Sequence, residues 1–131
     1  MDARELKRRA EKAREFDHKE EAEGFGFVVR IPGSVEMRAY LREASVAGVV
    51  NFDRLYRSLV PACVVSWQGP TAGHLVKDLP AEEAKQPLPC EAALIEELLG
   101  ERPQMMDRLA GELAVRYTER EAAKAAAAKN S

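Results

Sequence analysis

Residues 91–117 read EAALIEELLGERPQMMDRLAGELAVRY, and two helical patterns follow each other in this stretch. Apolar side chains recur at steps of three and four residues, which is the spacing of one face of an α-helix. The first face comprises Leu94, Ile95, Leu98 and Leu99, and the second comprises Met106, Leu109, Ala110, Leu113 and Tyr117. Gly100 suits a helix end, and Pro103 suits the first turn of the next helix. The stretch therefore predicts two consecutive amphipathic helices.

The chain after Tyr117 reads TEREAAKAAAAKNS, which has high helix propensity but no apolar face for packing. We expect this helix to fray toward the C-terminus. Residues 126–131 are predicted to form a flexible alanine-rich tail.

Two further amphipathic helices are predicted upstream, between residues 34 and 61. Ser34 and Asn51 are suited to cap them, and Pro61 ends or kinks the second. Their apolar faces comprise Met37, Tyr40, Leu41 and Ala44 in the first helix, and Phe52, Leu55, Tyr56 and Leu59 in the second.

The clearest strand pattern is FGFVVRI at residues 25–31, where apolar side chains occupy every second position. Residues 63–67, CVVSW, are either a helix end or a short strand. Trp67 is expected to anchor a corner of the core, with stacking on a ligand as the alternative. Residues 68–89 are rich in glycine and proline and are expected to be mostly loop.

Residues 2–23 are highly charged and carry a narrow apolar stripe. The stripe comprises Ala3, Leu6, Ala10 and Ala13, at helical spacing. Because three alanines and one leucine bury little surface, we expect a helix that frays or docks on a partner. Deleting residues 1–22 is then expected to leave the fold intact.

The predicted fold class is mainly α: a single small domain of amphipathic helices with one or two short strands and charged helical extensions at both ends. The predicted organisation is a charged helical extension at 1–23, a globular α-rich domain at 24–125, and the flexible tail at 126–131.

The composition of the 131 residues narrows the function classes. The net charge is −2, with basic and acidic side chains interspersed, so nucleic-acid binding has no electrostatic basis. No apolar run approaches the ~20 residues that span a bilayer, and the N-terminal residues show no secretory signal. We therefore expect a cytoplasmic protein that binds neither nucleic acid nor membrane.

The sequence contains none of the common motifs for phosphate binding, metal binding or serine-based catalysis. The chain has no glycine-rich phosphate loop, no metal-ligand spacing and no GxSxG motif. Cys63 and Cys90 are expected to be reduced, small buried side chains, although Cys63 with His74 would be the candidate nucleophile and base of an enzyme. The sequence predicts no cofactor, no metal and no catalysis.

The order of features from the strand to the C-terminus resembles a known family. The features are Val64-Val65-Ser66-Trp67-Gln68-Gly69, then Leu88-Pro89-Cys90-Glu91 at a helix start, then Leu98-Leu99, and then Arg102-Pro103 before the long final helix. In this order and spacing they resemble the tail assembly chaperones of long-tailed (siphovirus-type) bacteriophages and prophages. The likeness covers residues 24–131 and is strongest over 64–131, whereas the loop at 71–77 and the charged N-terminal extension depart from it.

The resemblance implies a non-enzymatic protein that binds the long, apolar tape measure protein, keeps it soluble and helps to recruit tail tube subunits. It also implies a location in the cytoplasm of the bacterial host and absence from the mature virion. A longer product of −1 ribosomal frameshifting is a further implication, and codons for Ala128-Lys129-Asn130 are compatible with the slippery heptamer A-AAA-AAC.

Protein binding requires exposed apolar surface, and two candidates are visible in the sequence. The first is the stripe with Leu6, Ala10 and Ala13, and the second is any part of the face with Met105, Met106 and Tyr117 that the core leaves uncovered. Core packing is the more common use of such methionines. Self-association is expected on the same grounds.

Two other functions remain open. An α-helical adaptor or regulatory module unrelated to phage would use the same binding chemistry on another client. A small enzyme would use Cys63 or His74.

Overall fold

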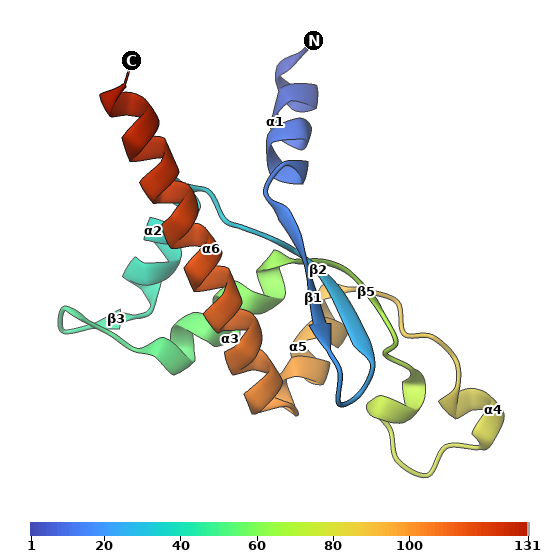
Figure 1. Ribbon diagram of the computed structural model, residues 1–131. Coiled ribbons are helices and arrows are strands. Elements are labelled where there is room, and N and C mark those ends of the chain that lie inside the picture. The colour runs from blue at the N-terminus through green and yellow to red at the C-terminus, as the bar shows by residue number, and fades with distance from the viewer. Residues whose placement is uncertain (131) are drawn as a thin grey trace.

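The computed structural model describes residues 1–130 and sets a small sheet beside a group of helices (Figure 1). The helices are α1 (Ala3–Lys12), α2 (Ser34–Glu43), α3 (Phe52–Cys63), η1 (Ala72–His74, a 3-10 turn), α4 (Ala81–Ala84), α5 (Ala92–Gly100) and α6 (Pro103–Lys129). The strands are β1 (Glu15–Glu20), β2 (Phe25–Arg30), β3 (Ser45–Val46), β4 (Val49–Val50) and β5 (Val64–Gln68).

Strand β2 is the centre of a three-stranded antiparallel sheet with β1 and β5 at its edges. It confirms the strand predicted from FGFVVRI, and Phe25, Phe27 and Val29 are buried on one face. A register shift between Val28 and Val29 marks a β-bulge against β5. The core lies between this face and helices α3, α5 and α6, whose buried side chains belong to the same apolar cluster.

The predicted mainly α fold class is wrong. Within residues 1–130 the chain forms two sheets and six α-helices, so the fold is mixed α/β. The predicted extension at 1–23 is helical only from Ala3 to Lys12, and Glu15–Glu20 form an edge strand instead. This strand was missed because two of the three side chains on its inward face, His18 and Glu20, are polar, which hides the two-residue apolar repeat.

The C-terminal helix also differs from its prediction. Residues 126–129, expected in a flexible tail, are the last turn of α6, and residue 131 lies outside the described residues. The predicted apolar face of α6 is confirmed, since Met106, Leu109, Ala110 and Leu113 are buried.

The two strands of the smaller sheet form a hairpin between α2 and α3. Ala47 (φ 52°) and Gly48 (φ 80°) both have positive φ, as in the two-residue turns that match the twist of a hairpin. Val46 and Val49 pair across this hairpin and are both exposed. The chain therefore presents apolar side chains at a protruding corner of the molecule (Figure 1).

Of the two predicted N-caps, Asn51 and Ser34, only Asn51 is confirmed. Asn51 caps α3 as expected, because its side-chain oxygen accepts a hydrogen bond of 3.0 Å from the backbone N–H of Arg54. Gly33 is the N-cap of α2, however, and Ser34 instead donates a hydrogen bond to a carboxylate oxygen of Glu121 in α6. The open assignment at 63–67 is settled as strand β5 from Val64 onward.

No helix within residues 1–130 combines the length and the apolar character that crossing a membrane requires.

Candidate functional site

The binding residues predicted from sequence are separated by the fold. Leu6 is 54% exposed on α1, a helix with no buried side chain, and Ala10 on this helix and Ala13 at its C-cap are exposed as well. Met105 and Met106 are buried and belong to the core, so they offer little free surface. Tyr117 is half-buried and lies on the edge of an apolar groove.

This groove, which we call the α2–α6 groove, lies between α2, α3 and α6. Its volume is about 190 Å³. Among the described residues, no charged side chain lines it, and the lining includes Met37, Leu41, Phe52, Tyr56, Leu113 and Tyr117. A concave strip of mixed aliphatic, thioether and aromatic side chains can accept the apolar face of an amphipathic helix.

Phe52 gives this groove an exposed aromatic rim. It is the first residue of α3, is 59% exposed, and has its ring centroid 6.0 Å from that of Tyr56. The hairpin residues Val46 and Val49 precede it in the chain and are also exposed. Of these exposed side chains only Phe52 lines the groove, and an exposed aromatic side chain at an apolar depression is typical of a protein-binding surface.

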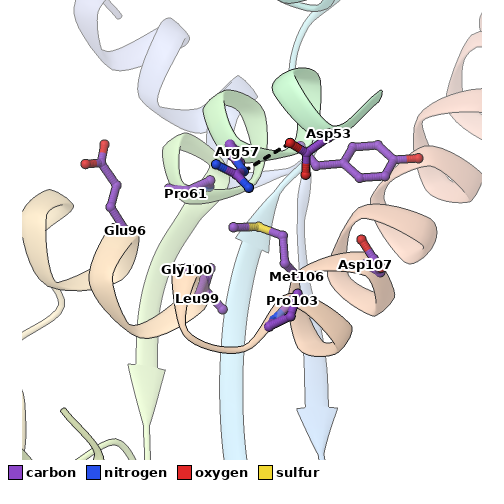
Figure 2. Close-up of a pocket in the computed structure, with 10 residues that line it drawn as sticks. Asp53, Arg57, Pro61, Glu96, Leu99, Gly100, Pro103, Met106 and Asp107 are labelled. Carbon is purple, nitrogen blue, oxygen red and sulfur yellow. Dashed lines mark ion pairs between the residues drawn. The ribbon is translucent and has the colours of Figure 1, made fainter. Parts of the chain in front are cut away.

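A second depression, which we call the acidic pocket, lies between α3, α5 and the start of α6 and has a volume of about 340 Å³ (Figure 2). Its apolar lining includes Pro61, Leu99 and Met106. Its carboxylates are Asp53, Glu96 and Asp107, and its one cation is Arg57, whose Nε lies 3.2 Å from Asp53 Oδ2. The pocket therefore combines apolar lining with a net negative charge.

An ion-pair network joins β1 to α6. His18 Nε2 lies 2.8 Å from Glu20 Oε1, and His18 Nδ1 contacts a carboxylate oxygen of Glu112. Arg108 Nη2 lies 2.7 Å from Glu20 Oε2, and Arg116 Nη2 lies 3.1 Å from Glu112 Oε2. Each inward polar group of β1 thus has a partner on α6, which explains how a charged strand can be part of the core.

The two carboxylates in this network are held ionised. Burial raises the pKa of Glu20, but hydrogen bonds from Arg108 and His18 outweigh it and leave the pKa lowered. Burial likewise raises the pKa of Glu112, and hydrogen bonds from His18 and Arg116 bring it below its ordinary value. Carboxylates with lowered pKa values are poor proton donors near neutral pH, so Glu20 and Glu112 are unsuited to general acid catalysis. The role of the network is to hold β1 to α6.

The candidate nucleophile Cys63 is not activated. Its side chain is buried, and burial raises the pKa of the thiol to about 12. His74 instead contacts Thr71, with Nδ1 accepting a hydrogen bond of 2.8 Å from the Thr71 backbone N–H. Within residues 1–130 no cluster of His, Cys, Asp or Glu side chains could hold a metal ion.

Trp67 occupies the position expected of a structural anchor. Its indole Nε1 donates a hydrogen bond of 2.8 Å to the backbone oxygen of Leu88, and its ring packs edge-on to Phe27 with centroids 6.4 Å apart. These contacts connect β5 to the loop before α5 and use both the polar and the apolar part of the indole.

The sequence placed Tyr117, which lines the α2–α6 groove, among the candidate binding residues, but it predicted neither depression as such and not the exposure of Phe52. Phe52 was assigned to an apolar helix face, and its exposure depends on how α2 and α6 pack around α3. The signal that could have pointed to it is the density of apolar side chains from Val46 to Phe52, which exceeds what a short connection between helices needs.

No protein-family model, curated protein or solved structure matches this chain.

Proposed function

We propose that the chain is a phage tail assembly chaperone that binds an apolar helix of its client in the α2–α6 groove. The observation that carries the proposal is this groove, which has an exposed Phe52 at its rim and no charged side chain among its described lining residues. The client is the tape measure protein, in keeping with the family resemblance of residues 24–131. The chain acts by binding and catalyses no reaction.

The groove suits a long apolar client whose helices vary in sequence. The aromatic side chains of Phe52, Tyr56 and Tyr117 supply apolar contact area, and contacts that depend more on area than on direction tolerate different apolar partners. Removing one phenylalanine side chain from water is worth about 1.5–3 kcal/mol, so a single groove gives modest affinity. Modest affinity is consistent with a chaperone that must leave before the tail is complete. We include in the same proposal that the chain helps to recruit tail tube subunits.

Co-expression with the tape measure protein from the same gene cluster tests the proposal. We expect the wild-type chain to keep that protein in the soluble fraction. Phe52→Asp is expected to remove this effect, because it places a charge at the apolar rim. Val65→Asp is the matched control, since Val65 is exposed on β5.

Both variants should keep the wild-type melting temperature, since both residues are exposed. A tape measure protein that stays insoluble with the wild-type chain contradicts the proposal. Equal loss of solubility with both variants contradicts the assignment to the groove.

The coding DNA provides an independent test. The proposal includes a longer −1 frameshift product, which requires a slippery heptamer near codons 128–130 and an open −1 frame beyond it. Absence of any overlapping frame would count against the phage assignment and favour an adaptor with another client.

A further inference from the structure

We infer that the α2–α6 groove and the acidic pocket form one continuous trough, and that its occupant is a client helix whose apolar face ends at lysine or arginine side chains. The inference rests on the proposed function, because it specifies the chemistry of the segment that the groove binds. The groove alone calls for an apolar helix, and the inference adds the charge of the residues beside that helix.

Tyr56 joins the two depressions, because its side chain lines both of them. Its neighbours on α3 are divided between the two, since Phe52 lines the groove and Asp53 lines the pocket. Helix α6 has the same order, because Ala110 lines the groove and Asp107, about one turn earlier, lines the pocket. The two depressions are therefore adjacent along both helices.

The length of this trough suits a helix. Asp107 lies at the pocket end of α6, and Thr118 lines the groove farther along the same helix. At 1.5 Å per residue, the span between them is about 17 Å, or about three helical turns. The apolar face of an amphipathic helix repeats over such a distance, so one client helix can reach both depressions.

The accessible surface of the trough changes from apolar to charged along its length. In the groove, the exposed or half-buried side chains include Leu41, Phe52, Tyr56 and Tyr117. In the pocket, the apolar core residues of the lining are buried, and the exposed part is mostly charged. The exposed lining residues of the pocket are Asp53, Arg57, Glu96, Gly100, Pro103 and Asp107.

The charged end of the trough is negative and has unpaired carboxylates. Arg57 pairs with Asp53, with Nε 3.2 Å from Oδ2. Within residues 1–130, no cation forms an ion pair with Glu96 or Asp107. Figure 2 shows these two carboxylates on different helices around the pocket. Basic side chains at one end of the client's apolar face can pair with them, and this pairing also fixes the direction in which the client lies.

Fluorescence anisotropy with labelled synthetic peptides and the purified full chain tests the inference. The peptides share an amphipathic helix of about 18 residues with a leucine face, and they differ only in a flank of lysine, glutamine or glutamate. Each flank is placed at the N-terminal end in one peptide and at the C-terminal end in another.

We expect the charge of the flank to control affinity. At low salt, the tighter of the two lysine peptides should bind the wild-type chain about fivefold to tenfold more tightly than its glutamine counterpart. The glutamate counterpart should bind more weakly than both. The differences should shrink at about 1 M salt, which screens exposed charges.

Variants with matched controls locate the two ends of the trough. Asp107→Lys and Glu96→Lys should each weaken binding of the lysine peptide by at least about threefold and strengthen binding of the glutamate peptide. Glu119→Lys and Glu97→Lys are the controls, because these residues are exposed on the same helices and line neither depression. Phe52→Gln removes the ring without adding a charge, and should weaken all the peptides alike, because they share the apolar face.

Equal affinity of the lysine and glutamine peptides overturns the inference, and so does an equal effect of Asp107→Lys and Glu119→Lys. A lysine peptide that Phe52→Gln does not weaken also overturns it, because the pocket would then be a site separate from the groove. Absence of binding by every peptide has the same consequence. The proposed function is tested separately by co-expression with the tape measure protein, so a failure of the inference is distinguishable from a failure of that proposal.

Discussion

Arg108 of α6 and Glu20 of β1 form an ion pair across 88 positions of the chain, with Arg108 Nε 2.9 Å and Nη2 2.7 Å from Glu20 Oε2. Glu20 is only 4% exposed, so the pair places a carboxylate inside the fold. The backbone of β1 pairs with β2, and this contact joins the same strand to helix α6.

Stability should therefore depend on pH through Glu20. Because the folded chain holds the pKa of Glu20 below its ordinary 4.5, the ionised carboxylate favours folding. The contribution is fully present above about pH 5 and is lost as the pH falls through the lowered value. Glu20→Gln should reduce the free energy of unfolding by about 1–3 kcal/mol at pH 7 and flatten the acid side of the stability profile, measured by urea denaturation.

The exposed neighbour Glu21 provides the control for this measurement. Glu21→Gln should reproduce the wild-type profile, and an unchanged profile for Glu20→Gln would show that the pair is not holding β1 in place.

Truncation separates α1 from β1. Deleting residues 1–12 should change the melting temperature by no more than roughly 2 °C, because no side chain of α1 is buried. Deleting residues 1–22, which the sequence alone suggested was harmless, removes buried Phe16 and Glu20 and an edge strand. That deletion should lower the melting temperature by at least roughly 10 °C, and a shift no larger than that of the short truncation would contradict the structure.

Trp67 should be among the most sensitive positions. Trp67→Ala removes both the packing on Phe27 and the hydrogen bond to Leu88, and should cost about 3 kcal/mol, or roughly 10 °C in melting temperature. Trp67→Phe keeps most of the packing and should cost about 1 kcal/mol. If Trp67→Ala behaves like the exposed-site control Val65→Ala in thermal unfolding, the indole is not an anchor.

Cys63 should be inert in the native chain. Its buried thiol has a pKa of about 12, so the reactive thiolate is scarce at neutral pH. In the Cys90→Ser variant, a chromogenic disulfide reagent should label Cys63 only as fast as the chain unfolds. Rapid labelling under native conditions would restore the enzyme hypothesis.

The parts of the fold that follow apolar periodicity could be predicted from sequence. Strand β2, the buried face of α6 and the Asn51 cap all rest on local patterns, and all are present. Strand β1 could not be predicted, because His18 and Glu20 are paired with residues roughly 90 positions later in the chain. The residue pattern of one sequence does not show such distant partners. The charges of this segment therefore indicated a solvated helix.

The candidate binding surfaces could be predicted only where they depend on local sequence spacing. The stripe of α1 depends on local spacing alone, and Leu6 is exposed as expected. The α2–α6 groove depends on how three helices pack. The sequence pointed to Tyr117, which lines the groove, and to Met105 and Met106, which the fold buries, but not to Phe52, which the fold exposes.

Site-specific photocrosslinking to the tape measure protein tests the central claim most directly. A benzophenone side chain at position 52 places the reactive group at the rim of the α2–α6 groove, and one at position 65 places it on exposed strand β5. We predict a covalent adduct with the co-expressed tape measure protein from position 52 and little or none from position 65. Adducts of equal yield from both positions, or an adduct from position 65 alone, would contradict binding in the groove.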